Sequence, residues 1–385
     1  MILFKQCEVY APEALGVQDV LVAGGRIVAL NKSIPTPSGI EVEVIAANGL
    51  KMIPGLIDGH VHIAGAGGEG GPATRTPELQ LSQMLEGGIT TVIGCLGTDG
   101  MTRSVQSVLM KAKGLRAEGV SCWIYTGAYQ VPTPTILGDV GKDIAMIEEV
   151  IGVGEIAISD HRSSCPTVEE LIRIAEHARV GGMLGGKAGI VNLHMGDAKH
   201  PFEPIYHAVE QSELNFKQFL PTHGNRNDYI FEDAKEYGKK GYVDLTASSY
   251  PYFPQYEIKP SQAIVQLLAA GVPLEHITMS SDGCGSLPDF DEQGNLVKLV
   301  SGPPASIFRE LIDAVRNEKL PLEQALKPVT SNPATILKLP RKGRINVGGD
   351  ADLVLLDGDY QIRHLLANGD WMIRDALRVK KGLFE

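Results

Sequence analysis

The chain has 385 residues, of which 43% are hydrophobic and 21% charged, and its formal net charge is -11 at pH 7. This length exceeds one simple core, so we expect one large domain and a smaller one. The negative charge argues against nucleic acid and anionic membrane as partners, because both bind basic surfaces. No signal-peptide pattern and no apolar run of the ~20 residues of a membrane span is present, so we predict a cytoplasmic protein.

Cysteine usage fits a reducing compartment. The five cysteines are scattered, odd in number and without CxxC spacing: Cys7, Cys95, Cys122, Cys165 and Cys284. We therefore expect neither a disulfide framework nor a cysteine-based zinc knot. Most of them are predicted to be small buried hydrophobic residues.

Both ends of the chain have the pattern of short strands. Residues 19–23 and 26–30 flank Gly24-Gly25, which predicts a β-hairpin. Near the other end, residues 353–357, 362–366 and 371–373 alternate with turn signals. Neither piece carries enough apolar surface to stand alone, so we predict a small β-sandwich domain built from residues 1–52 plus 343–385.

Between the two ends, apolar strand-like runs alternate with helical periodicity, which indicates βα units and a parallel sheet. The predicted helices include residues 168–179, 230–237 and 305–315. Eight strands are predicted, at residues 53–57, 90–94, 122–126, 156–159, 190–194, 219–223, 243–246 and 277–281. We therefore predict an α/β fold, a (β/α)8 TIM barrel over residues 53–342, with its site at the carboxyl ends of the strands.

The first predicted barrel strand leads into His60 and His62. Side chains two apart in extended backbone point the same way, so both imidazoles are placed to bind one metal ion. The alternative is a pair of core histidines that donate to backbone carbonyls. Asp58 beside them and a glycine-rich loop after them favour the metal.

Four further polar residues lie at the ends of other predicted strands. Glu155 is expected at the start of a middle strand, while His194, His223 and Asp282 follow later strands. Taken singly, Asp282 could start a turn and His223 could cap a helix. Taken together, the set predicts two divalent metals in the barrel mouth, where such a pair polarises a carbonyl and activates water.

Several stretches together resemble the amidohydrolase superfamily, and within it the bacterial isoaspartyl dipeptidases. The resemblance covers nearly the whole chain. The HxH element marks only the superfamily, whereas three stretches are narrower: Gly67-Gly68-Glu69-Gly70-Gly71, Ser159-Asp160-His161-Arg162 and Thr222-His223 with Asn225-Arg226.

The resemblance implies two zinc ions, the first held by His60, His62 and Asp282 and the second by His194 and His223. The family bridges its metals with a carbamylated lysine at the start of the middle strand. This sequence has no lysine between Lys142 and Lys187, and the matching position is Glu155. Glutamate offers the same charge and two oxygens on a shorter arm, so we expect Glu155 to bridge the metals. The competing interpretation is a structural carboxylate with one tightly bound metal.

The resemblance also implies the roles of residues around the metals. Glu69, helped by Thr98, would bind the substrate ammonium, and Arg162 and Arg226 its two carboxylates. Ser286 would add a hydrogen bond. Tyr129 would donate to the scissile carbonyl oxygen, and Asp282 would move the proton from water to the leaving amine.

The predicted function is hydrolysis of the β-aspartyl bond of isoaspartyl dipeptides by a zinc metallo-dipeptidase. The small dipeptide is the expected partner, without nucleic acid or membrane, and relatives of this kind form homo-oligomers, often octamers. One alternative is another amidohydrolase, such as a dihydroorotase-like cyclic amidase or an N-acyl amino-acid deacylase. The other is a non-catalytic scaffold relative, which would characteristically lose metal ligands.

Overall fold

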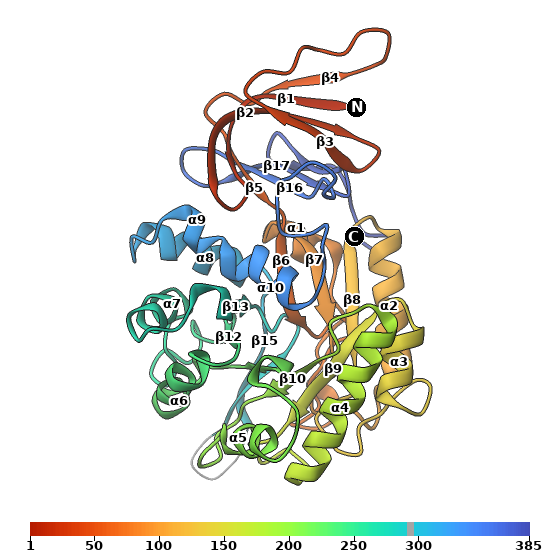
Figure 1. Cartoon of the computed structure of the whole chain (residues 1–385), viewed down its shortest axis with the longest axis vertical. Coiled ribbons are helices and arrows are strands. Elements are labelled where there is room, and N and C mark those ends of the chain that lie inside the picture. The colour runs from red at the N-terminus through yellow and green to blue at the C-terminus, as the bar shows by residue number, and fades with distance from the viewer. Residues whose placement is uncertain (291–295) are drawn as a thin grey trace.

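The computed structural model describes residues 1–290 and 296–385. Figure 1 shows a barrel-like body with helices on its outside and a separate layer of strands, contributed by both ends of the chain, above it. The barrel helices are α1 (Leu81–Glu86), α2 (Val105–Ala117), α3 (Val140–Met146), α4 (Val168–Gly185), α5 (Glu203–Glu210), α6 (Asp228–Gly238), α7 (Pro260–Ala269), α8 (Ser306–Arg316), α9 (Leu322–Ala325) and α10 (Ser331–Ile336).

Eight strands, in a six-stranded and a two-stranded sheet, make the wall of the barrel: β6 (Leu56–Val61), β7 (Ile89–Gly94), β8 (Ser121–Thr126), β9 (Val150–Ala157), β10 (Ile190–His194), β11 (Phe219–Thr222), β12 (Val243–Thr246) and β13 (Ile277–Ser280). Strands β6 to β11 pair in parallel in chain order, and β12 pairs in parallel with β13. Backbone hydrogen bonds link the two sheets, from Gly224 to Asp244 at 3.0 Å and from Asp282 to His60 at 3.1 Å. This curled parallel sheet fits the predicted (β/α)8 barrel.

Helix starts follow from capping side chains in the sequence. Thr167 and Glu170 form a reciprocal capping box at α4, and Asn227 accepts a hydrogen bond from the Ile230 amide at 2.9 Å to start α6. The predicted helices at 168–179, 230–237 and 305–315 are thus confirmed as α4, α6 and α8, with α4 continuing to Gly185.

The strands from both ends form one nine-stranded sheet, as the sequence predicted for their pairing. Its strands are β1 (Ile2–Tyr10), β2 (Ala14–Ala23), β3 (Arg26–Asn31), β4 (Glu43–Ala46), β5 (Lys51–Pro54), β16 (Leu353–Leu356), β17 (Ile362–Ala367), β18 (Asp370–Arg374) and β19 (Leu377–Arg378). Strands β5 and β16 join the two halves, with Ile53 opposite Val354. A β-sandwich divided from the barrel at 52/53 and 342/343 stays a prediction.

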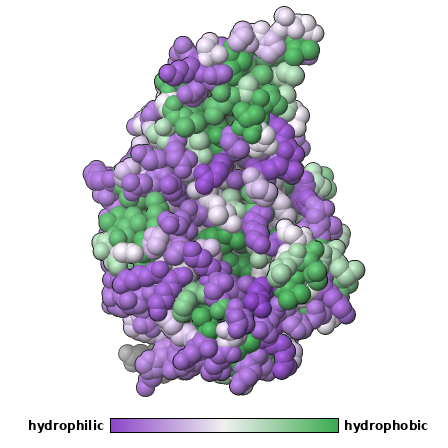
Figure 2. Space-filling view, in the orientation of Figure 1, coloured by the Kyte–Doolittle hydropathy of each residue, from purple (hydrophilic) through white to green (hydrophobic). Residues whose placement is uncertain are grey.

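Three hydrophobic clusters of buried side chains stabilise the barrel and the terminal sheet. The terminal sheet buries Phe4, Val20, Met52 and Leu355 in its own cluster. Figure 2 shows hydrophobic surface that remains over this sheet, where the exposed side chains include Val17 on β2.

Inside the barrel, buried apolar side chains of the strands pack against α10. This cluster contains Ile57, Ile93, Tyr125 and Leu220 together with residues of α10. Beyond β13, at the carboxyl end of the strands, β14 (Ser286–Phe290) pairs with β15 (Leu296–Ser301). The packing therefore leaves the carboxyl end of the strands for a site.

Two strand predictions were wrong in their positions. Residues 53–57 were predicted as one strand, but Gly55 separates β5 in the terminal sheet from β6 in the barrel. The strand predicted at 156–159 is β9, which starts at Val150, so Glu155 lies in its sixth position rather than at its start. A Cβ at Gly152 would lie 2.5 Å from the Ile190 carbonyl oxygen, so glycine is required there for close approach to β10 rather than for a turn.

Candidate active site

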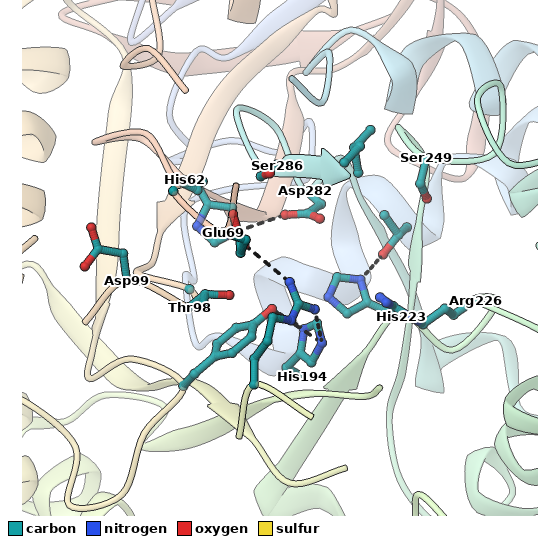
Figure 3. A pocket seen from close by; sticks show the side chains of 18 of the residues that line it. His62, Glu69, Thr98, Asp99, His194, His223, Arg226, Ser249, Asp282 and Ser286 are labelled. Carbon is teal, nitrogen blue, oxygen red and sulfur yellow. Dashed lines mark hydrogen bonds and ion pairs between the residues drawn. The ribbon is translucent and has the colours of Figure 1, made fainter. Parts of the chain in front are cut away.

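The carboxyl end of the barrel brings together all six predicted metal ligands. His60 and His62 come from the end of β6, Glu155 from β9, His194 from β10, and His223 and Asp282 follow β11 and β13. All six are buried. Figure 3 shows His62, His194, His223 and Asp282 pointing into one cavity.

Glu155 lies between two groups of histidines. Its Oε2 is 3.4 Å from His60 Nε2 and 3.9 Å from His62 Nε2. Its Oε1 is 2.7 Å from His194 Nδ1 and 3.1 Å from His223 Nε2. One carboxylate thus directs one oxygen to each group, which is the arrangement needed for a bridge between two cations.

Donor separations in the first group can be compared with those around bound zinc. From metal–ligand bonds of about 2.0–2.2 Å, two nitrogen or oxygen donors of one tetrahedral zinc lie about 3.3–3.6 Å apart. The 3.4 Å between Glu155 Oε2 and His60 Nε2 matches this range, whereas the 3.9 Å between Glu155 Oε2 and His62 Nε2 is slightly longer. Glu155 Oε2 is buried and lacks a hydrogen-bond partner, which leaves its lone pairs for a cation, and Asp282 Oδ1 lies 3.0 Å from His62 Nε2.

The second group is tighter than the first. The 2.7 Å between His194 Nδ1 and Glu155 Oε1 is a hydrogen-bond distance, so a zinc ion between these atoms requires them to separate by about 0.6 Å. The residue types nevertheless suit zinc, because imidazole and carboxylate are among its usual ligands.

The sequence analysis missed Cys95 as a member of the first group. Its buried Sγ lies 3.6 Å from His60 Nε2 and 3.8 Å from His62 Nδ1. His60, His62, Cys95 and Glu155 have donor atoms that all lie within 4.8 Å of one another. The expectation that most of the cysteines are buried is confirmed, because only Cys165 of the five is exposed, although Cys95 contacts predicted metal ligands.

A second set of side chains orients the imidazoles and was also missed. Asn192 Oδ1 lies 3.0 Å from His60 Nδ1, and Thr246 Oγ1 lies 2.7 Å from His223 Nδ1. These contacts hold the opposite nitrogen, Nε2, toward Glu155 in both rings. Such partners fix the ring orientation and tautomer of metal-binding histidines.

Two of the predicted ligands have an unusual backbone conformation. His223 and Asp282 have φ values of 64° and 54°, in the left-handed region that non-glycine residues rarely adopt. His223 directly follows β11, and Asp282 lies two residues after β13. Such strain is typical of functional positions.

The protonation states follow from burial and charge. Burial lowers the pKa of His223 to about 4, so its ring is neutral near pH 7 and retains a free lone pair. Burial alone would raise the pKa of Glu155, but His60 and His194 overcome this and hold it well below its ordinary range. Neutral imidazole and ionised carboxylate are the forms that bind metal.

The predicted substrate residues line one cavity of about 1320 Å³ at the same end of the barrel. Glu69, Thr98, Tyr129, Arg162, Arg226 and Ser286 all contribute to its wall. Figure 3 shows Glu69 and Thr98 on one side of the cavity and Arg226 on the opposite side. The predicted metal ligands, the acidic Glu69 and the two arginines therefore line the same cavity.

Glu69 and Arg162 form an ion pair in this cavity. Arg162 Nη1 lies 3.3 Å from Glu69 Oε1, and the other carboxylate oxygen, Oε2, is buried without a partner. Arg162 also donates to Asp160 through Nε at 2.9 Å and Nη2 at 2.8 Å. Asp160 in turn lies 2.9 Å from His194 Nε2, so it ties Arg162 to a predicted ligand.

Tyr129 and Arg226 complete the polar wall. The Tyr129 hydroxyl lies 2.6 Å from His194 Nδ1, and burial holds its pKa well above the ordinary range, so it remains a donor. Arg226 Nε donates to Asp197 at 3.2 Å. The Ser286 hydroxyl is buried without a partner and is free to bind a ligand.

The cavity also has residues without an earlier assignment. Phe253, Tyr256 and Leu287 supply apolar surface, and Glu257 accepts a hydrogen bond from Ser249 at 2.7 Å. His161, expected to be structural or to support a ligand, has a largely exposed side chain at the cavity rim.

Comparison with known proteins defines the class. Residues 52–374 match the model of the amidohydrolase family, so the chain belongs to that family and is a hydrolase. Among curated proteins, allantoinase of Enterococcus faecalis is 23% identical, over 88% of this chain and 83% of its own length. L-hydantoinase of Paenarthrobacter aurescens is 24% identical, over 94% of this chain and 86% of its own.

Solved structures give a narrower likeness. The β-aspartyl dipeptidase of Fervidobacterium islandicum AW-1 in complex with β-Asp-Leu is 43% identical, with a TM-score of 0.92, over 98% of this chain and 97% of that chain. A second structure of that enzyme is 41% identical, with a TM-score of 0.89, over 98% of both chains. The resemblance to isoaspartyl dipeptidases is thus confirmed. Among the described residues, no helix has the length and apolar character to cross a membrane.

Proposed function

We propose that the chain is a binuclear metal-dependent dipeptidase that hydrolyses the β-aspartyl bond of isoaspartyl dipeptides and releases aspartate. The observation that carries this proposal is the placement of one half-buried carboxylate, Glu69, and two arginines around the Glu155 cluster. An isoaspartyl dipeptide carries one ammonium and two carboxylates, so its charges complement this wall. The likeness of the chain to the β-aspartyl dipeptidase of Fervidobacterium islandicum supports the same substrate.

Recognition would replace contacts that the cavity already makes. The substrate ammonium would lie against Glu69 Oε2, which now lacks a partner, with Thr98 beside it. Arg162 and Arg226 would each bind a carboxylate, since guanidinium pairs with carboxylate through two parallel hydrogen bonds. The Glu69–Arg162 ion pair would thus open on binding. Glu69 would then bind the substrate ammonium, and Arg162 would bind a substrate carboxylate.

One cation would be held by His60, His62 and Asp282. The other would be held by His194 and His223, and Glu155 would bind both. Two divalent ions there supply Lewis acidity to the scissile carbonyl and activation of the attacking water. Tyr129 donates its hydroxyl proton as a hydrogen bond to the carbonyl oxygen, where negative charge develops. Asp282 accepts the proton of the water and returns it to the leaving amine.

The test compares three substrates with zinc-loaded and chelator-treated protein. We expect β-Asp-Leu to be cleaved, α-Asp-Leu and dihydroorotate to remain intact, and the chelator to abolish turnover. Cleavage of dihydroorotate alone would replace this proposal with a cyclic amidase, a class to which curated relatives at 28% identity over half of the chain belong. A lack of chelator-sensitive amide hydrolysis would favour a scaffold protein.

The remaining assignments extend the same proposal. We propose zinc as the metal because histidine and carboxylate donors suit it, and a homo-oligomer because apolar side chains such as Val17, Val28 and Val44 are exposed over the terminal sheet. We further propose cytoplasmic residence, and a separate β-sandwich domain formed by residues 1–52 plus 343–385.

A further inference from the structure

We propose that Cys95 is a metal ligand, and that its thiolate completes the cation site formed by His60, His62 and Glu155. The inference deepens the proposed function and rests on it in one respect, that a divalent metal occupies this end of the barrel. It assigns to the chain a mixed thiolate–carboxylate site in place of a site bridged by a carbamylated lysine.

The position of Cys95 in the fold is that of a ligand. It follows β7 directly, at the carboxyl end of the barrel, beside the β6 strand that carries His60. The 3.6 Å from its Sγ to His60 Nε2 equals the separation of about 3.6 Å expected for sulfur and nitrogen bound to one tetrahedral zinc. The 3.8 Å to His62 Nδ1 is only slightly longer.

A second observation points to a cation between these groups. Glu155 Oε2 lies in the same cluster, its side chain is 1% exposed, and this oxygen has no hydrogen-bond partner. A buried carboxylate oxygen without a donor is costly unless a cation binds it. The thiol, two imidazoles and this oxygen therefore form one group of four donors, and Asp282 Oδ1 lies beside it, 3.0 Å from His62 Nε2.

The other buried cysteines lack these surroundings. Cys122, in β8, has its Sγ 3.6 Å from the Trp123 carbonyl oxygen, which is a weak S–H contact of an ordinary buried thiol. Cys95 Sγ also lies 3.6 Å from the Val61 carbonyl oxygen, so the protonated thiol has a donor contact. When a divalent cation binds, the thiol proton passes to solvent and a sulfur–metal bond forms, without change in oxidation state.

Thiolate ligation would make the site selective among metals. Thiolates favour zinc and cobalt, whereas magnesium and manganese prefer oxygen donors. Glu155 would bridge on a shorter arm than a carbamylated lysine, and Cys95 adds a further anionic donor within 3.8 Å of both His60 and His62. We therefore expect zinc or cobalt to bind this site more tightly than manganese.

The test uses cobalt as a spectroscopic probe. The full chain loaded with cobalt is expected to show an intense near-ultraviolet thiolate-to-cobalt band. The band should disappear in Cys95→Ser and persist in Cys122→Ser, the matched control for loss of a buried thiol. A wild-type protein that binds cobalt without this band, a protein that binds no cobalt, or a band that survives in Cys95→Ser would each overturn the proposal.

X-ray absorption and zinc affinity give two further measurements. X-ray absorption of the zinc-loaded wild type is expected to show a sulfur scatterer at about 2.3 Å from zinc. In addition, Cys95→Ser should bind zinc at least about 10-fold more weakly, the smallest loss typical of partners outside the ligand shell. A zinc shell of nitrogen and oxygen alone would overturn the assignment.

These readouts separate this inference from the proposed function. A thiolate band in a protein that leaves β-Asp-Leu intact would retain Cys95 as a ligand and remove the dipeptidase assignment. Cleavage of β-Asp-Leu by a protein without zinc–sulfur ligation would do the reverse.

Discussion

Replacement of Glu69 by glutamine separates substrate recognition from the chemistry at the barrel end. The change keeps the side-chain shape but removes the charge that would pair with the substrate ammonium. Glu69 Oε2 is buried without a partner, so it would make a full charge-assisted hydrogen bond with the substrate ammonium. Glu69→Gln would lose this contribution to binding, about 1.5–3 kcal/mol. We expect kcat/KM for β-Asp-Leu to fall about 10- to 150-fold.

The assay compares β-Asp-Leu with succinyl-leucine, which has the same amide and carboxylates but no ammonium. Wild type should prefer β-Asp-Leu, and Glu69→Gln should lose most of this preference while succinyl-leucine turnover changes little. Glu78→Gln is the matched control, because Glu78 is an exposed glutamate of the same connection, paired with Lys111 at 3.4 Å. Equal losses on both substrates would refute the recognition role of Glu69.

Other variants and conditions test the remaining roles. Tyr129→Phe should lower kcat about 10²- to 10³-fold with little change in KM, because it removes a donor to the developing oxyanion; steady-state kinetics would contradict this if only KM changed. Arg226→Met should lower kcat/KM for β-Asp-Leu about 10- to 150-fold and leave an amidated substrate that lacks its partner carboxylate unaffected. Although burial lowers the pKa values of His60 and His62, the neighbouring thiol and carboxylates raise both well above normal, so metal must displace these protons. Zinc affinity should therefore rise with pH through neutrality and fall on acidification, as competitive-chelator titrations would show.

The fold was predictable where the sequence carries unambiguous periodicity. Residues 190–194 and 243–246 are apolar or β-branched runs between turn signals, and they form β10 and β12 with those bounds. The start of β9 was missed because Gly152 and Gly154 look like turn residues, although both lie where a Cβ would collide with β10. Glycine required for close strand packing has the same sequence signature as glycine required for a turn.

The clustering of the six predicted ligands could be expected from motifs and residue chemistry, but the contacts around them could not. Cys95 has no sequence motif that links it to His60 and His62, because these histidines lie at the end of a different strand, β6. The signal that could have found it is its place directly after the second barrel strand, equivalent to the ligand positions of other strands. Asn192 and Asp160 likewise acquire their roles only when β9 and β10 bring them beside histidine rings.

The most direct test of the account is activity measured as zinc is added back to metal-free protein. If Glu155 bridges two cations, hydrolysis of β-Asp-Leu should rise until two zinc ions are bound per chain. Full activity with one zinc ion per chain, or activity without zinc, would contradict the binuclear site.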